Sequence, residues 1–113
     1  MKRDVKLFVQ DILDNINDIG EFSKNLTKEK LISSKLKQNA IVRSIEIIGE
    51  AVKNIPDSIK EKYKDVEWNK IAGARDIIIH RYFKVDLESV WDVIENDLPI
   101  LKKQMEKIKT ELD

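Results

Sequence analysis

The sequence contains no cysteine and a single histidine among its 113 residues. Without cysteine the chain forms no disulfide and has no thiol chemistry, and one histidine leaves too few nitrogen or sulfur ligands for a zinc site. We therefore expect the protein to use neither a metal nor a cofactor.

The chain also lacks a net charge and a long apolar run. Its 21 basic residues balance its 21 acidic residues, so any attraction to a nucleic acid must be local. The start "MKRDVKLFVQDILD" carries charges where a signal peptide needs an apolar core, and no apolar run approaches membrane length. We expect one domain over residues 1–113, in a soluble cytoplasmic protein without membrane contacts.

Apolar residues recur in steps of three or four, which predicts long amphipathic helices. The first stripe comprises Val5, Phe8, Ile12, Ile16, Ile19, Phe22 and Leu26. The second comprises Ile41, Ile45, Ile48, Val52 and Ile55, and Pro56 marks its end. The third comprises Leu87, Trp91, Ile94, Leu98, Leu101, Met105, Ile108 and Leu112, with Asp86 as the expected N-cap. Pro99 predicts a kink or break near residues 95–98.

Shorter elements connect these helices. We expect a helical turn in "SKNLTKEKLISSK", a short helix beginning at Pro56 in "PDSIKEKYKD", a loop at residues 64–66, and a helix that carries "EWNKIAGARDIII". The period-two alternation of strands is absent. The predicted fold is an all-α, up-and-down helical bundle. The stripe of the last helix also fits a coiled-coil dimer interface, and the pattern alone does not choose between the two.

The polar residues gather in "GARDIIIHRYF". On a continuous helix Asp76 and His80 lie on one face, where the carboxylate orients the imidazole and favours its charged form. A histidine held in this way can transfer protons. Arg75 lies five positions before His80, well round the helix, so the two converge only if the helix ends near Ile79 or His80, or if a second chain supplies one of them.

Further cations and a phenol follow the histidine. Arg81, Tyr82 and Lys84 extend the polar surface in a way that suits a phosphodiester and a stacked base. An alternative is that His80 and Arg81 complement the dipole of a helix C-terminus. Residue types do not decide between the two.

A second polar group lies on the preceding long helix. Arg43, Glu46 and Glu50 share one face by their spacing, which fits a solvated face with salt bridges. The alternative is that Glu46 or Glu50 faces the "GARDIIIHRYF" cluster across the bundle.

The segment "RDIIIHRY" resembles the R-x4-H-x-Y signature of HepT-like toxins, which belong to the HEPN superfamily of ribonucleases. Three flanking phrases resemble that family in the same order: "RSIEIIGEAVKNIP", "YKDVEWNKIAGARD" and "RYFKVDLESVWDVIENDLPILKKQ". Together they cover most of residues 40–104. Where the family commonly carries asparagine after the arginine, this chain carries Asp76.

The resemblance implies a HEPN-type bundle and a metal-independent endoribonuclease, the toxin of a toxin–antitoxin pair. Arg75 and His80 would be the catalytic pair, with Asp76 in support and Arg81 and Lys84 as possible RNA contacts. The implied antitoxin is an MNT-type nucleotidyltransferase that attaches AMP to Tyr82.

Because one chain supplies one histidine, a two-fold homodimer would be needed to bring an acid and a base to one RNA cleft. The resemblance also leaves open a helical partner of a nucleotidyltransferase that does not cleave RNA.

Overall fold

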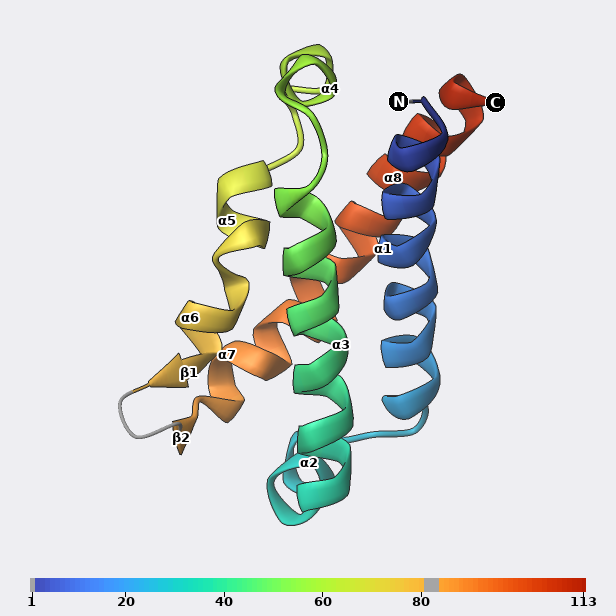
Figure 1. Cartoon of the computed structure of the whole chain (residues 1–113). Helices are drawn as coiled ribbons and strands as arrows, with labels where there is room; N and C mark the ends of the chain where they lie inside the picture. The colour runs from blue at the N-terminus through green and yellow to red at the C-terminus, as the bar shows by residue number, and fades with distance from the viewer. Residues whose placement is uncertain (1, 81–83) are drawn as a thin grey trace.

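The computed structural model describes residues 2–80 and 84–113, with the backbone alone for residues 2–4, 77, 79, 80 and 84 (Figure 1). Four runs of helix alternate in direction. The first is α1 (Lys2–Phe22), the second α3 (Lys35–Lys53), the third α5 (Trp68–Ala72) with α6 (Ala74–Ile78), and the fourth α7 (Leu87–Asp92), η2 (Val93–Asp97) and α8 (Leu98–Leu112). The predicted up-and-down helical bundle is confirmed.

Short helices close the two ends of the bundle. The predicted helical turn is α2 (Lys28–Ser33), which Thr27 caps by accepting a hydrogen bond from the Lys30 amide. The predicted second short helix is α4 (Asp57–Lys62). Pro56 precedes α4 as its N-cap, with φ −63° and ψ 150°, and is not part of its first turn as we had expected. The proline therefore ends one helix and sets the direction of the next.

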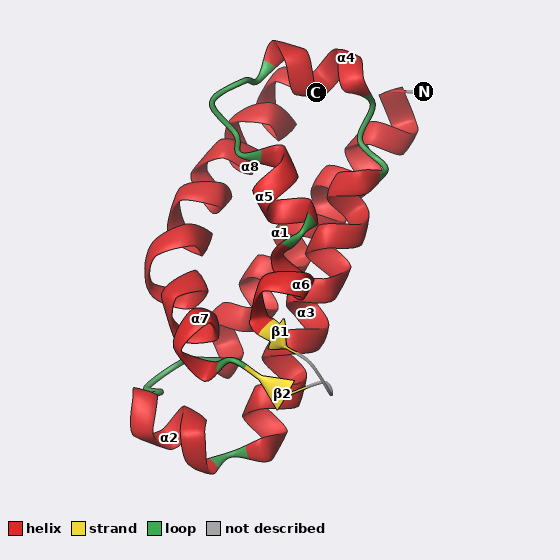
Figure 2. Cartoon of the chain, turned by 90° about the vertical axis from the view of Figure 1, so that its left-hand side faces the viewer, coloured by secondary structure: helices red, strands yellow, loops and turns green. Residues whose placement is uncertain are grey.

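The core lies where α1, α3 and α8 meet (Figures 1 and 2). The predicted apolar stripes supply it, and their most deeply buried members are Ile12, Ile19, Ile41, Val52, Met105 and Ile108. The start of α1 lies beside the end of α8, where Lys6 pairs with Asp113 at 3.4 Å. α5 and α6 cover the side of α3 that faces away from α1 (Figure 1).

The last long helix is distorted before Pro99, as predicted. Residues Val93–Asp97 form the π-helix η2 between α7 and α8. A proline cannot donate the amide hydrogen bond of a regular helix and its ring crowds the preceding turn, so the turn widens. Asp86 caps α7 as predicted, since its Oδ1 accepts from the Ser89 amide.

One feature was not predicted from the sequence. Two-residue strands, β1 (Ile79–His80) and β2 (Lys84–Val85), pair in antiparallel fashion with Ile79 opposite Val85 and His80 opposite Lys84. Strands of two residues are too short to show alternation, so no periodic pattern predicts them.

The connection from α4 to α5 is fastened to α8 by polar contacts. The Tyr63 hydroxyl donates to Glu111 Oε1 at 2.5 Å, and the Trp68 indole donates to the Tyr63 carbonyl at 2.9 Å. Tyr63 is buried, and its hydrogen bond to the Glu111 carboxylate together with burial raises the pKa of Tyr63 to about 12. This attachment holds the start of α5 and therefore the segment that follows it.

The raised pKa of Tyr63 leads to a prediction about stability. The protonated phenol stabilises the folded state fully below the unfolded pKa of about 10. This stabilisation is lost as pH rises towards the folded pKa of about 12, because the phenol of the unfolded chain releases its proton first. We expect Tyr63→Phe to lower the free energy of unfolding by about 2 kcal/mol near neutral pH, since the lost hydrogen bond is to a carboxylate. Between pH of about 10 and 12, the free energy of unfolding of the Tyr63→Phe protein should decline less steeply than that of the parent.

Urea denaturation of both proteins across this range measures the effect, and Tyr82 is present in both, so its own titration cancels. An equal decline in the two proteins would contradict the assignment.

Candidate active site

The segment with the polar cluster is not one helix, as we had expected, but two helices followed by a strand. α5 ends at Ala72, Gly73 adopts φ −92° and ψ 5°, and α6 begins at Ala74. The Asp76 amide bonds to the Gly73 carbonyl only three residues back, which is the tighter spacing of a turn. Glycine is a poor helix former, and the helix breaks there.

α6 ends at a buried anchor. Ile78 is 0% exposed, and its carbonyl accepts a hydrogen bond of 2.6 Å from the Asp86 amide. The next two residues, Ile79 and His80, leave the helix and pair with β2. The chain therefore changes direction between Arg75 and His80.

The end of α6 at Ile78 makes the predicted helical pairing of Asp76 with His80 wrong. It also meets the condition for Arg75 and His80 to converge. Asp76 and His80 do not share a helical face, because His80 lies in β1. His80 follows the last residue of α6 by two positions, so it still lies close to a helix C-terminus, and the alternative that it complements the helix dipole stays a prediction. The convergence of Arg75 with His80 required a helix end near Ile79, and α6 ends at Ile78.

Arg75 is held by a residue from another helix. Its Nε donates to Glu46 Oε2 of α3 at 2.9 Å. The side chains of Arg75 and Glu46 are 46% and 30% exposed, so the contact lies at the surface with one side open to solvent. Glu46 therefore faces the cluster, which was one of the two alternatives for this group of charges.

Asp76 makes a much weaker contact with the arginine. Its Oδ1 lies 4.0 Å from Arg75 Nη1, and its side chain is 86% exposed. An exposed pair at this distance contributes little in water. Glu46 and not Asp76 therefore orients Arg75, whose side chain stays partly exposed to solvent.

Gly49 of α3 is not among the residues predicted from the sequence. A Cβ at this position of α3 would lie 3.2 Å from the Ala72 carbonyl oxygen and 3.3 Å from that of Ile71. Because these are backbone atoms, they cannot avoid the Cβ by a change of rotamer, as a flexible side chain would. Gly49 allows α5 to lie directly on α3 and places α6 over Glu46, one turn earlier on α3. A glycine inside a long helix, where it costs stability, was the available signal.

The remaining predicted site residues are described only in part. The backbones of His80 and Lys84 pair across the two strands. Arg81 and Tyr82 lie outside the described residues. Within residues 2–80 and 84–113, no group of three or more His, Cys, Asp or Glu side chains is arranged to hold a metal ion. In the same part of the chain, no helix is long and apolar enough to span a membrane.

Comparison with known proteins places the sequence in a family. Residues 12–108 match the family described as "Ribonuclease HepT-like". A protein of Methanocaldococcus jannaschii named "Putative RNase" is 45% identical over 112 residues, which are 99% of this chain and 93% of the relative. A "Probable ribonuclease HepT" of Thermococcus cleftensis is 39% identical over 109 residues, 96% of this chain and 99% of the relative.

One relative is longer. A second M. jannaschii protein, named as a gamma-glutamylcyclotransferase and putative RNase, is 45% identical over all 113 residues, but these span only 51% of that protein. No solved structure matches the chain at a significant level.

The contact between Arg75 and Glu46 yields a prediction. We expect Glu46→Gln to lower the free energy of unfolding by less than about 1 kcal/mol, since a half-exposed ion pair contributes no more. The variant should nevertheless release the arginine. The Arg75 Nε–H signal in NMR spectra should move and exchange faster with solvent.

The matched control is Glu50→Gln, one turn further along α3, whose carboxylate has no charged partner among the described residues. An unchanged Arg75 signal in Glu46→Gln would contradict the contact.

Proposed function

This chain belongs to the HepT-like ribonuclease family, and we propose that it is a metal-independent endoribonuclease with Arg75 and His80 as its catalytic pair. The observation that carries the proposal is the end of α6 at Ile78, between the two residues. It removes the helical geometry that would hold them apart. The family match over residues 12–108 supports the same reaction class.

The proposed reaction is attack by the ribose 2′-hydroxyl on the neighbouring phosphorus. A base takes the proton of the 2′-hydroxyl, the new bond from the 2′-oxygen to phosphorus forms, and the bond to the 5′-oxygen breaks. An acid gives the 5′-oxygen a proton. The products are a 2′,3′-cyclic phosphate and a free 5′-hydroxyl. His80 serves in proton transfer, and Arg75 stabilises the additional negative charge on the phosphorane.

Glu46 has a supporting role in this proposal. Its carboxylate bonds to Arg75 Nε, which leaves the terminal guanidinium nitrogens for the phosphate. Arg81 and Lys84 would contact the RNA backbone, and Asp76 would lie at the edge of the site.

We further propose that the active form is a two-fold homodimer. Each chain has one histidine, whereas the reaction needs both an acid and a base. Two copies of the motif at one cleft would supply both. They would also combine the cations of two motifs into one basic surface, although the chain as a whole has no net charge.

The proposed biological role is that of a cytoplasmic toxin, neutralised when an MNT-type nucleotidyltransferase transfers AMP from ATP to the Tyr82 oxygen with loss of pyrophosphate. The motif "RDIIIHRY" supports this role. A helical partner of a nucleotidyltransferase that does not cleave RNA remains the alternative, and the first experiment below separates the two.

Incubation of the purified protein with total RNA tests the catalytic pair. We expect cleavage in excess EDTA, with 2′,3′-cyclic phosphate or its hydrolysis product at the new ends. His80→Ala and Arg75→Ala should each lower the rate at least about 100-fold, with unchanged helical content by circular dichroism. Lys109→Ala, which removes a cation from the far end of α8, should cleave at the parental rate.

Cleavage by His80→Ala at the parental rate would overturn the assignment. A requirement for magnesium with 5′-phosphate ends would indicate different chemistry. Absence of cleavage by the parent chain would favour the alternative function, a partner of a nucleotidyltransferase that does not cleave RNA.

Modification of Tyr82 is tested separately. AMP on this oxygen would bring a negative phosphate beside the cations that bind substrate, so inhibition needs no conformational change. Tyr82→Phe should keep most of the cleavage activity, because the phenol transfers no proton, yet escape neutralisation by the nucleotidyltransferase and ATP. Intact-mass measurement should show AMP on the parent chain and none on the variant. Modification or silencing of the variant would make Tyr82 a substrate-stacking residue instead.

A further inference from the structure

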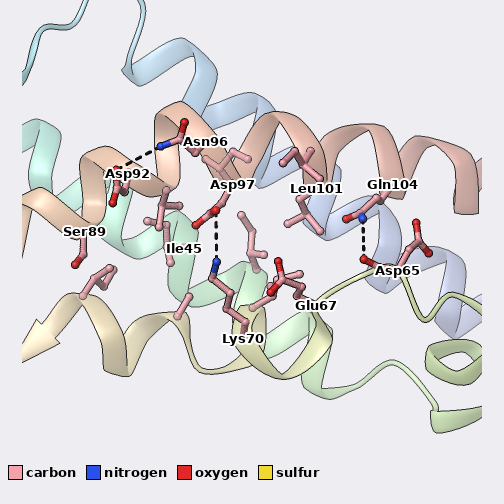
Figure 3. Close-up of a pocket in the computed structure, with 17 residues that line it drawn as sticks. Ile45, Asp65, Glu67, Lys70, Ser89, Asp92, Asn96, Asp97, Leu101 and Gln104 are labelled. Atoms are coloured by element: carbon pink, nitrogen blue, oxygen red, sulfur yellow. Dashed lines mark hydrogen bonds and ion pairs between the residues drawn. The ribbon is translucent and has the colours of Figure 1, made fainter.

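A pocket of about 330 Å³ lies between α5 and α6 on one side and α7, η2 and α8 on the other (Figure 3). Its volume is in the range of small-molecule sites. Buried aliphatic side chains from three parts of the bundle form its interior, among them Ile45, Ile48, Ile78 and Leu101. This aliphatic part of the pocket is unfavourable for water, because water finds few hydrogen-bonding partners there.

The charged residues of the pocket are mostly acidic. Asp65, Glu67, Asp92 and Asp97 line it together with one cation, Lys70. Lys70 Nζ lies 3.6 Å from Asp97 Oδ1, and Figure 3 shows this pair joining α5 to η2 across the pocket. Asp92 accepts a hydrogen bond from Asn96. Four carboxylates against one ammonium favour a cationic ligand.

Lys70 shows which cation fits. It places a primary ammonium on a flexible alkyl chain against Asp97, beside the aliphatic interior. A hydrated metal ion would gain nothing from that interior, and an anion would meet the carboxylates. A second alkylammonium would combine both halves of the pocket, with its chain among the isoleucines and its charge at Asp92 and Asp97.

We propose that this pocket binds a small primary aliphatic amine. The inference concerns binding alone and does not rest on ribonuclease activity. η2 is part of the site, since Val93, Asn96 and Asp97 line the pocket. Pro99 explains why the helix distorts, but not why the distortion borders an apolar pocket.

Binding would also reach the arginine on α6. Ala74 and Ile78 line the pocket, whereas Arg75 between them pairs with Glu46 outside it. Arg75 adjoins Ala74 in this five-residue helix, so a ligand against Ala74 would lie close to the arginine. An occupied pocket should therefore change the environment of the Arg75 Nε–H group.

An NMR titration of the full chain with n-hexylamine at neutral pH tests the proposal, with 1-hexanol and hexanoate as probes of the same length and different charge. We expect saturable shifts at the amides of Ile71, Ala74 and Val93, with the Arg75 Nε–H signal following the same curve. The amine should bind about fivefold or more tightly than the alcohol, which corresponds to one favourable ion pair at a surface. Hexanoate should bind least.

Two variants separate the contribution of the aliphatic interior to amine binding from that of the carboxylate. Ala74→Leu fills the pocket and should weaken both amine and alcohol at least about tenfold. Asp97→Asn should lower the affinity for the amine to that for the alcohol and leave the alcohol unaffected. The matched control, Asp14→Asn on α1, should leave both affinities unchanged.

Absence of saturable shifts at these amides would overturn the proposal. Equal affinities for amine and alcohol, or an Asp97→Asn protein with the parental preference for the amine, would overturn the ammonium assignment. Because Asp97 is at the surface of the pocket, its variant decides the question even if Ala74→Leu proves unstable.

Discussion

The close approach of α5 to α3 is the constraint on which the candidate site depends. At Gly49 the two backbones are so near that an added Cβ would meet two carbonyl oxygens at 3.2 and 3.3 Å. Glycine inside a helix costs about 1 kcal/mol relative to alanine, so propensity alone would favour alanine here. The contact opposes that preference. A larger residue would push α5 outwards and carry α6, with Arg75, away from Glu46.

The long helices and the short ones serve different purposes in this arrangement. α1, α3 and α8 bury continuous apolar stripes and account for most of the core. α5 and α6, at five residues each, are too short to be stable alone and depend on what they contact. Their ends are correspondingly well fastened. Tyr63 and Trp68 hold the start of α5, and Asp86 bonds to the carbonyl of Ile78 at the end of α6. Such a segment can change direction sharply and bring residues together that a long helix would separate.

The sequence predicted the parts of the fold that follow from periodicity and from strong local signals. The three apolar stripes, the cap at Asp86 and the distortion before Pro99 were all predicted, because each depends on residues near in sequence. The break at Gly73 and the strands at Ile79 and Val85 were missed. The strands depend on a contact made elsewhere in the sequence, the Asp86 amide against the Ile78 carbonyl, and periodicity within "EWNKIAGARDIII" carries no information about it. The break at Gly73 had a local signal, because glycine is a poor helix former, but periodicity does not register it.

The same distinction applies to the site. The motif indicated Arg75 and His80 as a pair, yet helical spacing alone argued against their convergence, and only the tertiary structure removes that objection. Glu46 was one of two glutamates the spacing could offer. Which of them meets Arg75 depends on how far α6 lies along α3, and the spacing within the sequence does not give that distance. Glu46, which orients Arg75, and Gly49, which allows the close approach of α5, both lie on α3. The orientation of the arginine and the packing of α5 therefore depend on the same helix. In the proposed function, a substrate phosphate would meet a guanidinium that Glu46 already orients at Nε.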